Sequence, residues 1–125
     1  MAQWIIDGNN VFGSRPDGWW NDRSSAMLRF TQSVAEWCRT HGDDVVLVFD
    51  GPVPDSVMNL AGGNLVIAEA PRRGRDAADD HIVDLTSASS QNRTTVITSD
   101  RGLRDRLPRA VTVHGTGAFR ELIGY

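Results

Sequence analysis

Five short apolar runs, separated by segments with helical or turn character, constrain the fold more than any other feature of this sequence. The runs are Trp4–Ile6, Val45–Phe49, Asn64–Ala68, Thr94–Thr98 and Ala110–Val113. Val45–Phe49 is apolar throughout, which is typical of a parallel strand covered on both faces. Because such runs alternate with helical segments, the sequence predicts one α/β domain over residues 1–125 with a mostly parallel five-stranded sheet.

The segments between these runs carry helical periodicity or turn residues. Helices are expected from about Ser24 to Gly42, Asp55 to Leu60, Asp76 to Ser89, Arg101 to Leu107 and Ala118 to Ile123. Arg15–Asn21 and Pro71–Arg75 are predicted to be loops. Asp7-Gly8-Asn9-Asn10 consists of turn residues, so no helix is expected directly after the first strand.

The composition excludes several classes of site. All 13 basic residues are arginine, which excludes lysine-dependent phosphate loops and Schiff-base enzymes. The single cysteine, Cys38, excludes an internal disulfide and fits a reducing cytoplasm. No apolar run approaches the length of a membrane span. Asp outnumbers Glu by 13 to 3, which suggests caps, turns or metal ligands, whereas a GC-rich genome alone would explain the missing lysine.

Carboxylates fall where predicted strands end. They are Asp7, Asp50 and Asp100 at three strand ends, and Asp76, Asp79 and Asp80 at the start of the helix that follows the third strand. Parallel strands end on one edge of a sheet, and hard divalent cations prefer oxygen ligands. The sequence therefore predicts an acidic metal site at this edge. The alternative is structural, with Asp100 as a helix N-cap and Asp50 as a turn residue.

The predicted helix Asp76–Ser89 separates its acidic residues by angle. Its inward stripe is Ala78, Ile82, Leu85 and Ser89. Asp79 borders this stripe in the first turn and is the better candidate for a metal ligand. Asp80 and Asp84 lie on the outer face, where we expect them to be solvated or paired with arginine.

Seven of the 13 arginines flank two of the acidic motifs. They are Arg72, Arg73 and Arg75 on one side, and Arg101, Arg104, Arg106 and Arg109 on the other. An acidic centre with basic rims suits a nucleic-acid backbone that crosses a metal site, and the alternative is a solvated loop and helix face. Trp19 and Trp20 either stack on unpaired bases or pack their loop onto the domain.

Four motifs, in their order along the chain, resemble those of the NYN-domain branch of PIN-like nucleases, and within it the YacP-like group. They are Asp7-Gly8-Asn9-Asn10, Val48-Phe49-Asp50, Ala78-Asp79-Asp80 and Thr98-Ser99-Asp100, together with the ending Gly115-Thr116-Gly117-Ala118-Phe119. The group has Asp-Gly-Tyr-Asn, Val-Phe-Asp, Thr-Ala-Asp-Glu and Thr-Ser-Asp. The departures are Asn9 for Tyr, Ala77 for Thr and Asp80 for Glu.

This resemblance implies a PIN-like three-layer α/β/α sandwich with strand order 3-2-1-4-5 and a metal-dependent ribonuclease activity, expected to be endonucleolytic. It implies catalytic carboxylates at Asp7, Asp79 and Asp100, which would bind Mg²⁺ or Mn²⁺, with Asp50 as a fourth. The residues expected to bind substrate are Asn10, Arg72, Arg73, Arg75, Arg101 and Arg104. The expected partner is RNA, with mRNA in a ribosomal context and a second copy of the chain as further candidates.

The chemistry expected of such a site is metal-assisted hydrolysis of a phosphodiester bond, with the aspartates as ligands and no covalent intermediate. Two alternatives stay open: a non-catalytic RNA-binding module and a metal-dependent nucleotide phosphohydrolase. A haloacid-dehalogenase phosphatase is not expected, because Asp7 is not followed by a second Asp two residues later.

Overall fold

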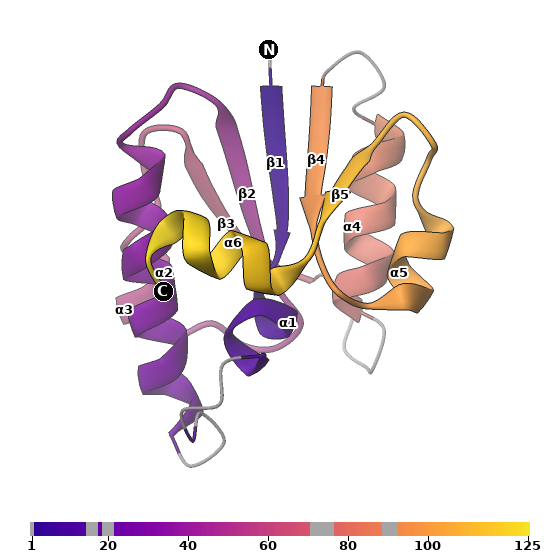
Figure 1. Ribbon diagram of the computed structural model, residues 1–125. Helices are drawn as coiled ribbons and strands as arrows, with labels where there is room; N and C mark the ends of the chain where they lie inside the picture. The colour runs from indigo at the N-terminus through magenta and orange to yellow at the C-terminus, as the bar shows by residue number, and fades with distance from the viewer. Residues whose placement is uncertain (1, 15–17, 19–21, 71–76, 89–92) are drawn as a thin grey trace.

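Five parallel strands form one sheet in the order β3-β2-β1-β4-β5 in a computed structural model of the chain, which describes residues 2–14, 18, 22–70, 77–88 and 93–125 (Figure 1). The strands are β1 (Ala2–Asp7), β2 (Asp44–Phe49), β3 (Leu65–Glu69), β4 (Arg93–Ile97) and β5 (Thr112–His114). The helices are α1 (Gly8–Gly13), α2 (Arg23–Cys38), α3 (Asp55–Met58), α4 (Ala77–Ala88), α5 (Arg101–Arg106) and α6 (Thr116–Ile123). The predicted strand order 3-2-1-4-5 is confirmed.

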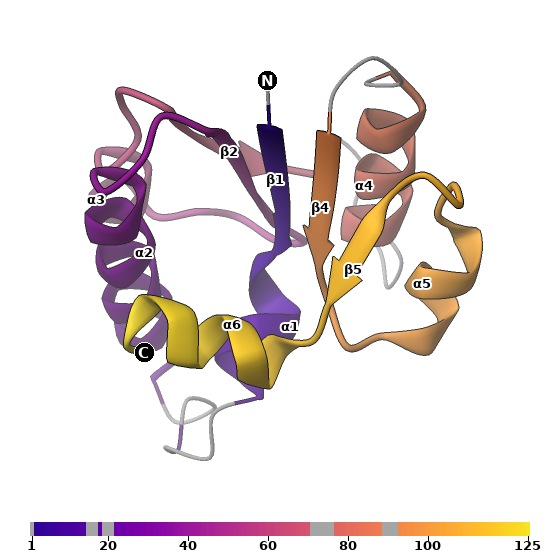
Figure 2. The ribbon, with the colours of Figure 1, turned by 45° about the horizontal axis from the view of Figure 1, so that its top comes forward.

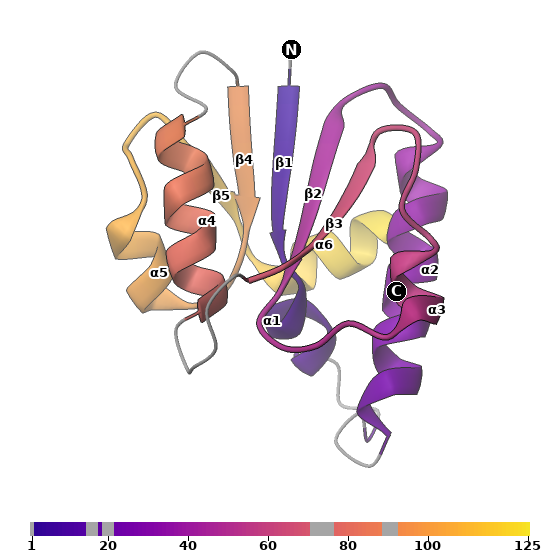
Figure 3. The same cartoon turned by 180° about the vertical axis from the view of Figure 1, so that it is seen from behind.

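The helices cover both faces of the sheet and give the expected three layers. α2 and α6 lie on one face, and α4 and α5 lie on the other, which Figure 3 shows from behind. The side chains of β1 alternate between these layers, so that Ile6 joins the apolar cluster under α2 while Ile5 joins the cluster under α4. A central strand buried on both faces explains the uninterrupted apolar runs in the sequence.

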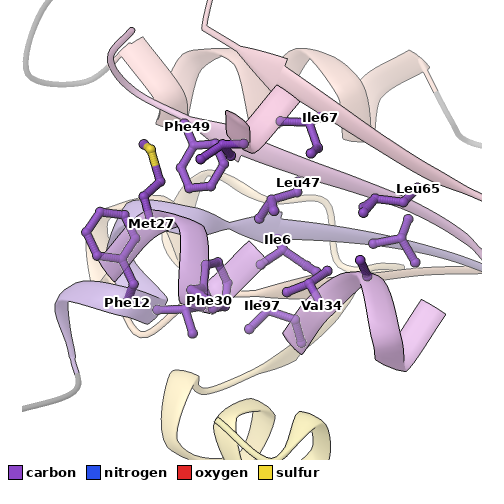
Figure 4. Close-up of a cluster of buried hydrophobic side chains, with 14 of the residues drawn as sticks. Ile6, Phe12, Met27, Phe30, Val34, Leu47, Phe49, Leu65, Ile67 and Ile97 are labelled. Carbon is purple, nitrogen blue, oxygen red and sulfur yellow. The ribbon is translucent and has the colours of Figure 1, made fainter. Parts of the chain in front are cut away.

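The cluster under α2 contains most of the large buried side chains. Phe12, Phe30 and Phe49 are fully buried there and surround Met27 (Figure 4). The rings of Phe12 and Phe49 have centroids 6.3 Å apart. Burial of each such ring contributes about 1.5–3 kcal/mol to stability. This core fixes the position of α1 against the end of β2.

Helix α1 corrects the expectation that only turn residues follow the first strand. Gly8 begins the helix, and Val11 and Phe12 are buried in the core. A Cβ atom on Gly8 would lie 2.6 Å from Cε1 of Phe49 and 2.9 Å from the carbonyl oxygen of Val48. Tertiary packing therefore overrides the weak helix propensity of Gly8-Asn9-Asn10, and only glycine permits this approach.

Gly8→Ala should lower the free energy of unfolding by about 1–3 kcal/mol, because the added methyl group collides with the backbone of β2. Gly117→Ala is the matched control, since its Cβ would meet nothing within 4 Å. Denaturant-induced unfolding measures both. A Gly8→Ala protein as stable as the Gly117→Ala protein would contradict the close contact between α1 and β2.

Several expectations fall outside the described residues. They are the loops Arg15–Asn21 and Pro71–Arg75 with Trp19, Trp20, Arg72, Arg73 and Arg75, and the helix ends at Asp76 and Ser89. Among the helices that the structure describes, none is both long and apolar enough to cross a membrane.

Candidate active site

Asp7 ends the central strand and is the buried centre of the acidic edge. Its residue is 5% exposed. Burial is the main reason that the pKa of Asp7 rises from 3.8 to about 7, and a hydrogen bond from Thr98 acts in the opposite direction. Repulsion from Asp79, Asp100 and Asp50 raises this pKa further. The structure therefore places Asp50, Asp79 and Asp100 close enough to Asp7 for their charges to raise its pKa.

Thr98, immediately after β4, links the Asp7 carboxylate to the backbone of Asp100. Its hydroxyl group donates a hydrogen bond of 2.9 Å to Oδ2 of Asp7, and its Oγ1 accepts one of 3.1 Å from the backbone N–H of Asp100. Thr98 is fully buried, so it holds the Asp7 carboxylate in one orientation. Thr98 stands in one of the four motifs, but its residue type and position predicted no role in the site.

The two asparagines of α1 accept hydrogen bonds from the backbone of the residues that follow β2 and β4. Oδ1 of Asn9 accepts a hydrogen bond of 2.9 Å from the N–H of Asp50, and Oδ1 of Asn10 accepts one of 2.8 Å from the N–H of Ser99. Asn9, which replaces the Tyr of the related motif, is thus a positioning residue that sequence reasoning missed. Since Oδ1 of Asn10 accepts this bond, its Nδ2 group is the donor that Asn10 could offer to a substrate.

Arginines of the described residues pair with Asp50 and with Asp80 at this edge. Nη2 of Arg23 lies 3.1 Å from Oδ1 of Asp50, and Nη2 of Arg106 lies 2.8 Å from Oδ1 of Asp80. The expected pairing of Asp80 with an arginine is confirmed, whereas the pair between Arg23 and Asp50 was not predicted. Because Arg23 partly neutralises Asp50, this carboxylate is less suited to bind a cation than Asp7.

Asp100 and Asp79 each stand at the beginning of a helix, α5 and α4 respectively. Oδ1 of Asp100 accepts a hydrogen bond of 3.2 Å from the N–H of Leu103, so Asp100 caps α5 as the structural alternative proposed. Asp79 is half-buried in the first turn of α4, next to the buried Ala78. Ala78 and Ile82 are both buried, which confirms the orientation predicted for this helix.

The carboxylates that the structure describes at the acidic edge are the ligand type of a hard-cation site, but they do not surround one ion position in this structure. Among the residues that the structure describes, no three Asp, Glu, His or Cys side chains are gathered closely enough to hold a metal ion. The candidate ligands are all carboxylates, as Mg²⁺ and Mn²⁺ prefer. A divalent cation would also relieve the repulsion that raises the pKa of Asp7. The donor set therefore fits such an ion, and the carboxylates would have to come closer together to surround it.

The acidic edge also forms hydrogen bonds with the beginning of α6. Oγ of Ser99 accepts a hydrogen bond of 2.9 Å from the N–H of Thr116 and lies 3.0 Å from its Oγ1. A Cβ on Gly115 would lie 3.4 Å from Oγ of Ser99, which leaves little room for a side chain there. These contacts give the Gly115–Phe119 motif a structural role.

No protein-family model and no curated protein matches the chain. Solved structures do. Rae1 (YacP) from Bacillus subtilis superposes with a TM-score of 0.71 at 21% identity, over 98% of this chain and 74% of Rae1. A mutant of Rae1 gives a TM-score of 0.70 at 22% identity, over 98% and 75% of the two chains. The chain has the Rae1 fold.

A further solved structure, of another protein, is similar in fold. The T5 D15 protein, co-crystallised with metal ions, matches with a TM-score of 0.51 at 12% identity. The match covers 94% of this chain and 55% of that one. The resemblance to the YacP-like group is thus confirmed for the fold, with the PIN-like sheet order that it implied. At these identities the similarity to Rae1 establishes the fold rather than the chemistry.

Proposed function

We propose that the protein is a metal-dependent ribonuclease, acting as an endonuclease on RNA phosphodiester bonds at the carboxyl edge of the sheet. The observation that carries this proposal is the burial of Asp7 beside three further carboxylates that raise its pKa. A fold that gathers like charges around a buried carboxylate does so at a cost in stability, which a functional cation would offset. The Rae1 fold and the four motifs add support.

In this proposal Asp7, Asp79 and Asp100 hold Mg²⁺ or Mn²⁺, and Asp50 is a fourth carboxylate close by. When bound, the ion would activate water for attack on the phosphodiester bond and stabilise the leaving oxygen. Thr98 keeps the Asp7 carboxylate oriented through its 2.9 Å hydrogen bond. Asn9 and Asn10 position the residues after β2 and β4, because their side-chain oxygens accept hydrogen bonds from the backbone N–H groups there.

The substrate is proposed to be RNA because arginines stand beside the carboxylates. Arg101 and Arg104 are exposed on α5, which starts directly after Asp100. With Asn10, and with Arg72, Arg73 and Arg75 outside the described residues, they form the proposed substrate-binding set. Arginine pairs well with phosphate oxygens, and its neutralising charge makes nucleic-acid binding sensitive to salt.

The experiment that tests this function is incubation of end-labelled RNA, single-stranded and structured, with Mn²⁺ or with EDTA. We expect internal cleavage products with Mn²⁺ and none with EDTA. The Asp79→Asn protein, purified identically, controls for a contaminating ribonuclease. RNA that is bound but left intact would contradict the proposal and indicate a binding module. Hydrolysis of a nucleoside triphosphate but not of RNA would indicate a phosphohydrolase.

A further inference from the structure

A hollow of about 430 Å³ lies between α5 and β5, the last strand at one edge of the sheet. Figure 2 shows these two elements side by side at that edge of the molecule. We call this hollow the α5–β5 groove, and the residues that line it include Arg101, Arg104, Arg109, Leu107, Val111 and Val113. Its volume is within the range of roughly 300–1,000 Å³ that is usual for small-ligand pockets.

The lining of the α5–β5 groove combines cations with apolar groups. Arg101, Arg104 and Arg109 are all exposed, and Asp105 is the acidic residue among the lining residues. Leu107, with two valines, supplies a half-buried apolar surface. Arginine side chains bind phosphate, and an apolar surface binds the face of an unpaired base. Arg106, by contrast, is engaged with Asp80.

The position of the α5–β5 groove connects it with the carboxylates. Arg101 follows Asp100 directly, so one end of the groove adjoins the acidic edge. The other end reaches Arg109, in the connection that leads from α5 to β5. A chain of phosphates that leaves the acidic edge along α5 would therefore meet one arginine after another.

Resting on the ribonuclease function proposed above, we infer that the α5–β5 groove is a subsite that binds one unpaired nucleotide next to the cleaved bond. Arg104 and Arg109 hold phosphates that flank this nucleotide. Its base lies on the apolar surface of Leu107 and Val111. A base in a duplex is stacked and paired, so it cannot reach this surface.

A protein partner is the competing occupant, because no strand among the described residues pairs with the outer edge of β5. An extended acidic peptide could in principle add a strand there. However, β5 has only three residues, Thr112–His114, which offer few backbone hydrogen bonds. The apolar lining beside three arginines also fits a nucleotide better than an acidic peptide.

Fluorescence anisotropy in EDTA tests this inference without cleavage. The probe is a labelled RNA of about 12 nucleotides, single-stranded or annealed to its complement, at several salt concentrations. The groove variant is Arg104→Gln with Arg109→Gln. The matched control is Arg39→Gln with Arg93→Gln, which removes the same charge from exposed arginines after α2 and at the first residue of β4. Thermal unfolding verifies that both proteins fold.

We expect the parent to bind single-stranded RNA more tightly than duplex. The groove variant should lose roughly tenfold in affinity for the single strand, and its salt dependence should flatten by a slope of about 1.4, as for two lost phosphate contacts. The control variant should stay within about twofold of the parent. Val111→Thr, which adds a hydroxyl group to the apolar surface, should weaken single-strand binding without changing the salt slope.

Equal losses in the groove and control variants would overturn the inference, as would equal binding of duplex and single strand. Binding of an acidic peptide but of neither RNA would identify the competing occupant and also overturn it. The proposed ribonuclease function can fail separately. If single-strand binding depends on Arg104 and Arg109 but no Mn²⁺-dependent cleavage occurs, the groove stands and the catalytic proposal falls.

Discussion

Asp79→Asn should lower single-turnover cleavage of RNA by at least about a hundredfold, whereas Asp80→Asn should change it by less than about threefold. Asp79 lies in the first turn of α4 and its charge acts on the buried Asp7, so in the proposed site this charge would contribute to cation binding. The Asp80 carboxylate pairs with Arg106 at 2.8 Å, and the two side chains are about half exposed. Loss of such a surface pair costs at most about 1 kcal/mol.

This pair of variants is its own control, because adjacent residues undergo the same chemical change. Circular dichroism should show both proteins folded, and RNA binding in EDTA should persist in both. If Asp80→Asn abolishes cleavage and Asp79→Asn does not, the assignment of the ligand on α4 is wrong. If both variants cleave RNA like the parent, α4 contributes no catalytic carboxylate.

Asp7→Asn should stabilise the protein in EDTA at pH 8 by about 2 kcal/mol and should give no gain near pH 4. The pKa of Asp7 is about 7 in the folded state and 3.8 ordinarily. Between these values the folded state binds more protons than the unfolded state, so the parent loses stability as the pH rises through this window. The full pKa difference corresponds to about 4 kcal/mol of stability, and the cost of burying the Asn amide offsets a part of this gain.

Denaturant-induced unfolding across this pH range measures the effect. The acceptor for the Thr98 hydroxyl group is retained in Asp7→Asn, so the orienting hydrogen bond is not lost. Asp80→Asn is the control and should change stability by less than about 1 kcal/mol at both pH values. An Asp7→Asn protein that is less stable than the parent at pH 8 would show that the carboxylate at this position is not under strain from burial and repulsion.

The sequence predicted the sheet because each strand carries its own local signal. Val45–Phe49 is apolar without alternation, and β2 spans Asp44–Phe49 as a strand buried between two layers. The sequence also predicted that Asp7 and Asp100 lie at the same edge of the sheet, because parallel strands end on one edge. The strand order itself came from the resemblance of the motifs rather than from any periodicity.

Local patterns could not predict the features that depend on contacts between distant segments. Helix α1 forms from residues with weak helix propensity because Gly8 fits against Phe49, which lies 41 residues away in the sequence. The bond from Thr98 to Asp7 spans 91 residues, and the bond between Arg23 and Asp50 spans 27. Each of these contacts needs the folded sheet before its partners can be identified.

Thermal unfolding with Mn²⁺ tests most directly whether the acidic edge is a metal site. A cation that binds only the folded state stabilises it by about 2.7 kcal/mol at a hundred times its dissociation constant, which raises the melting temperature by several degrees. We expect this rise at millimolar Mn²⁺, its reversal by EDTA and its loss in Asp79→Asn. An unchanged melting temperature of the parent protein at millimolar Mn²⁺ would contradict the metal site on which the proposed activity depends.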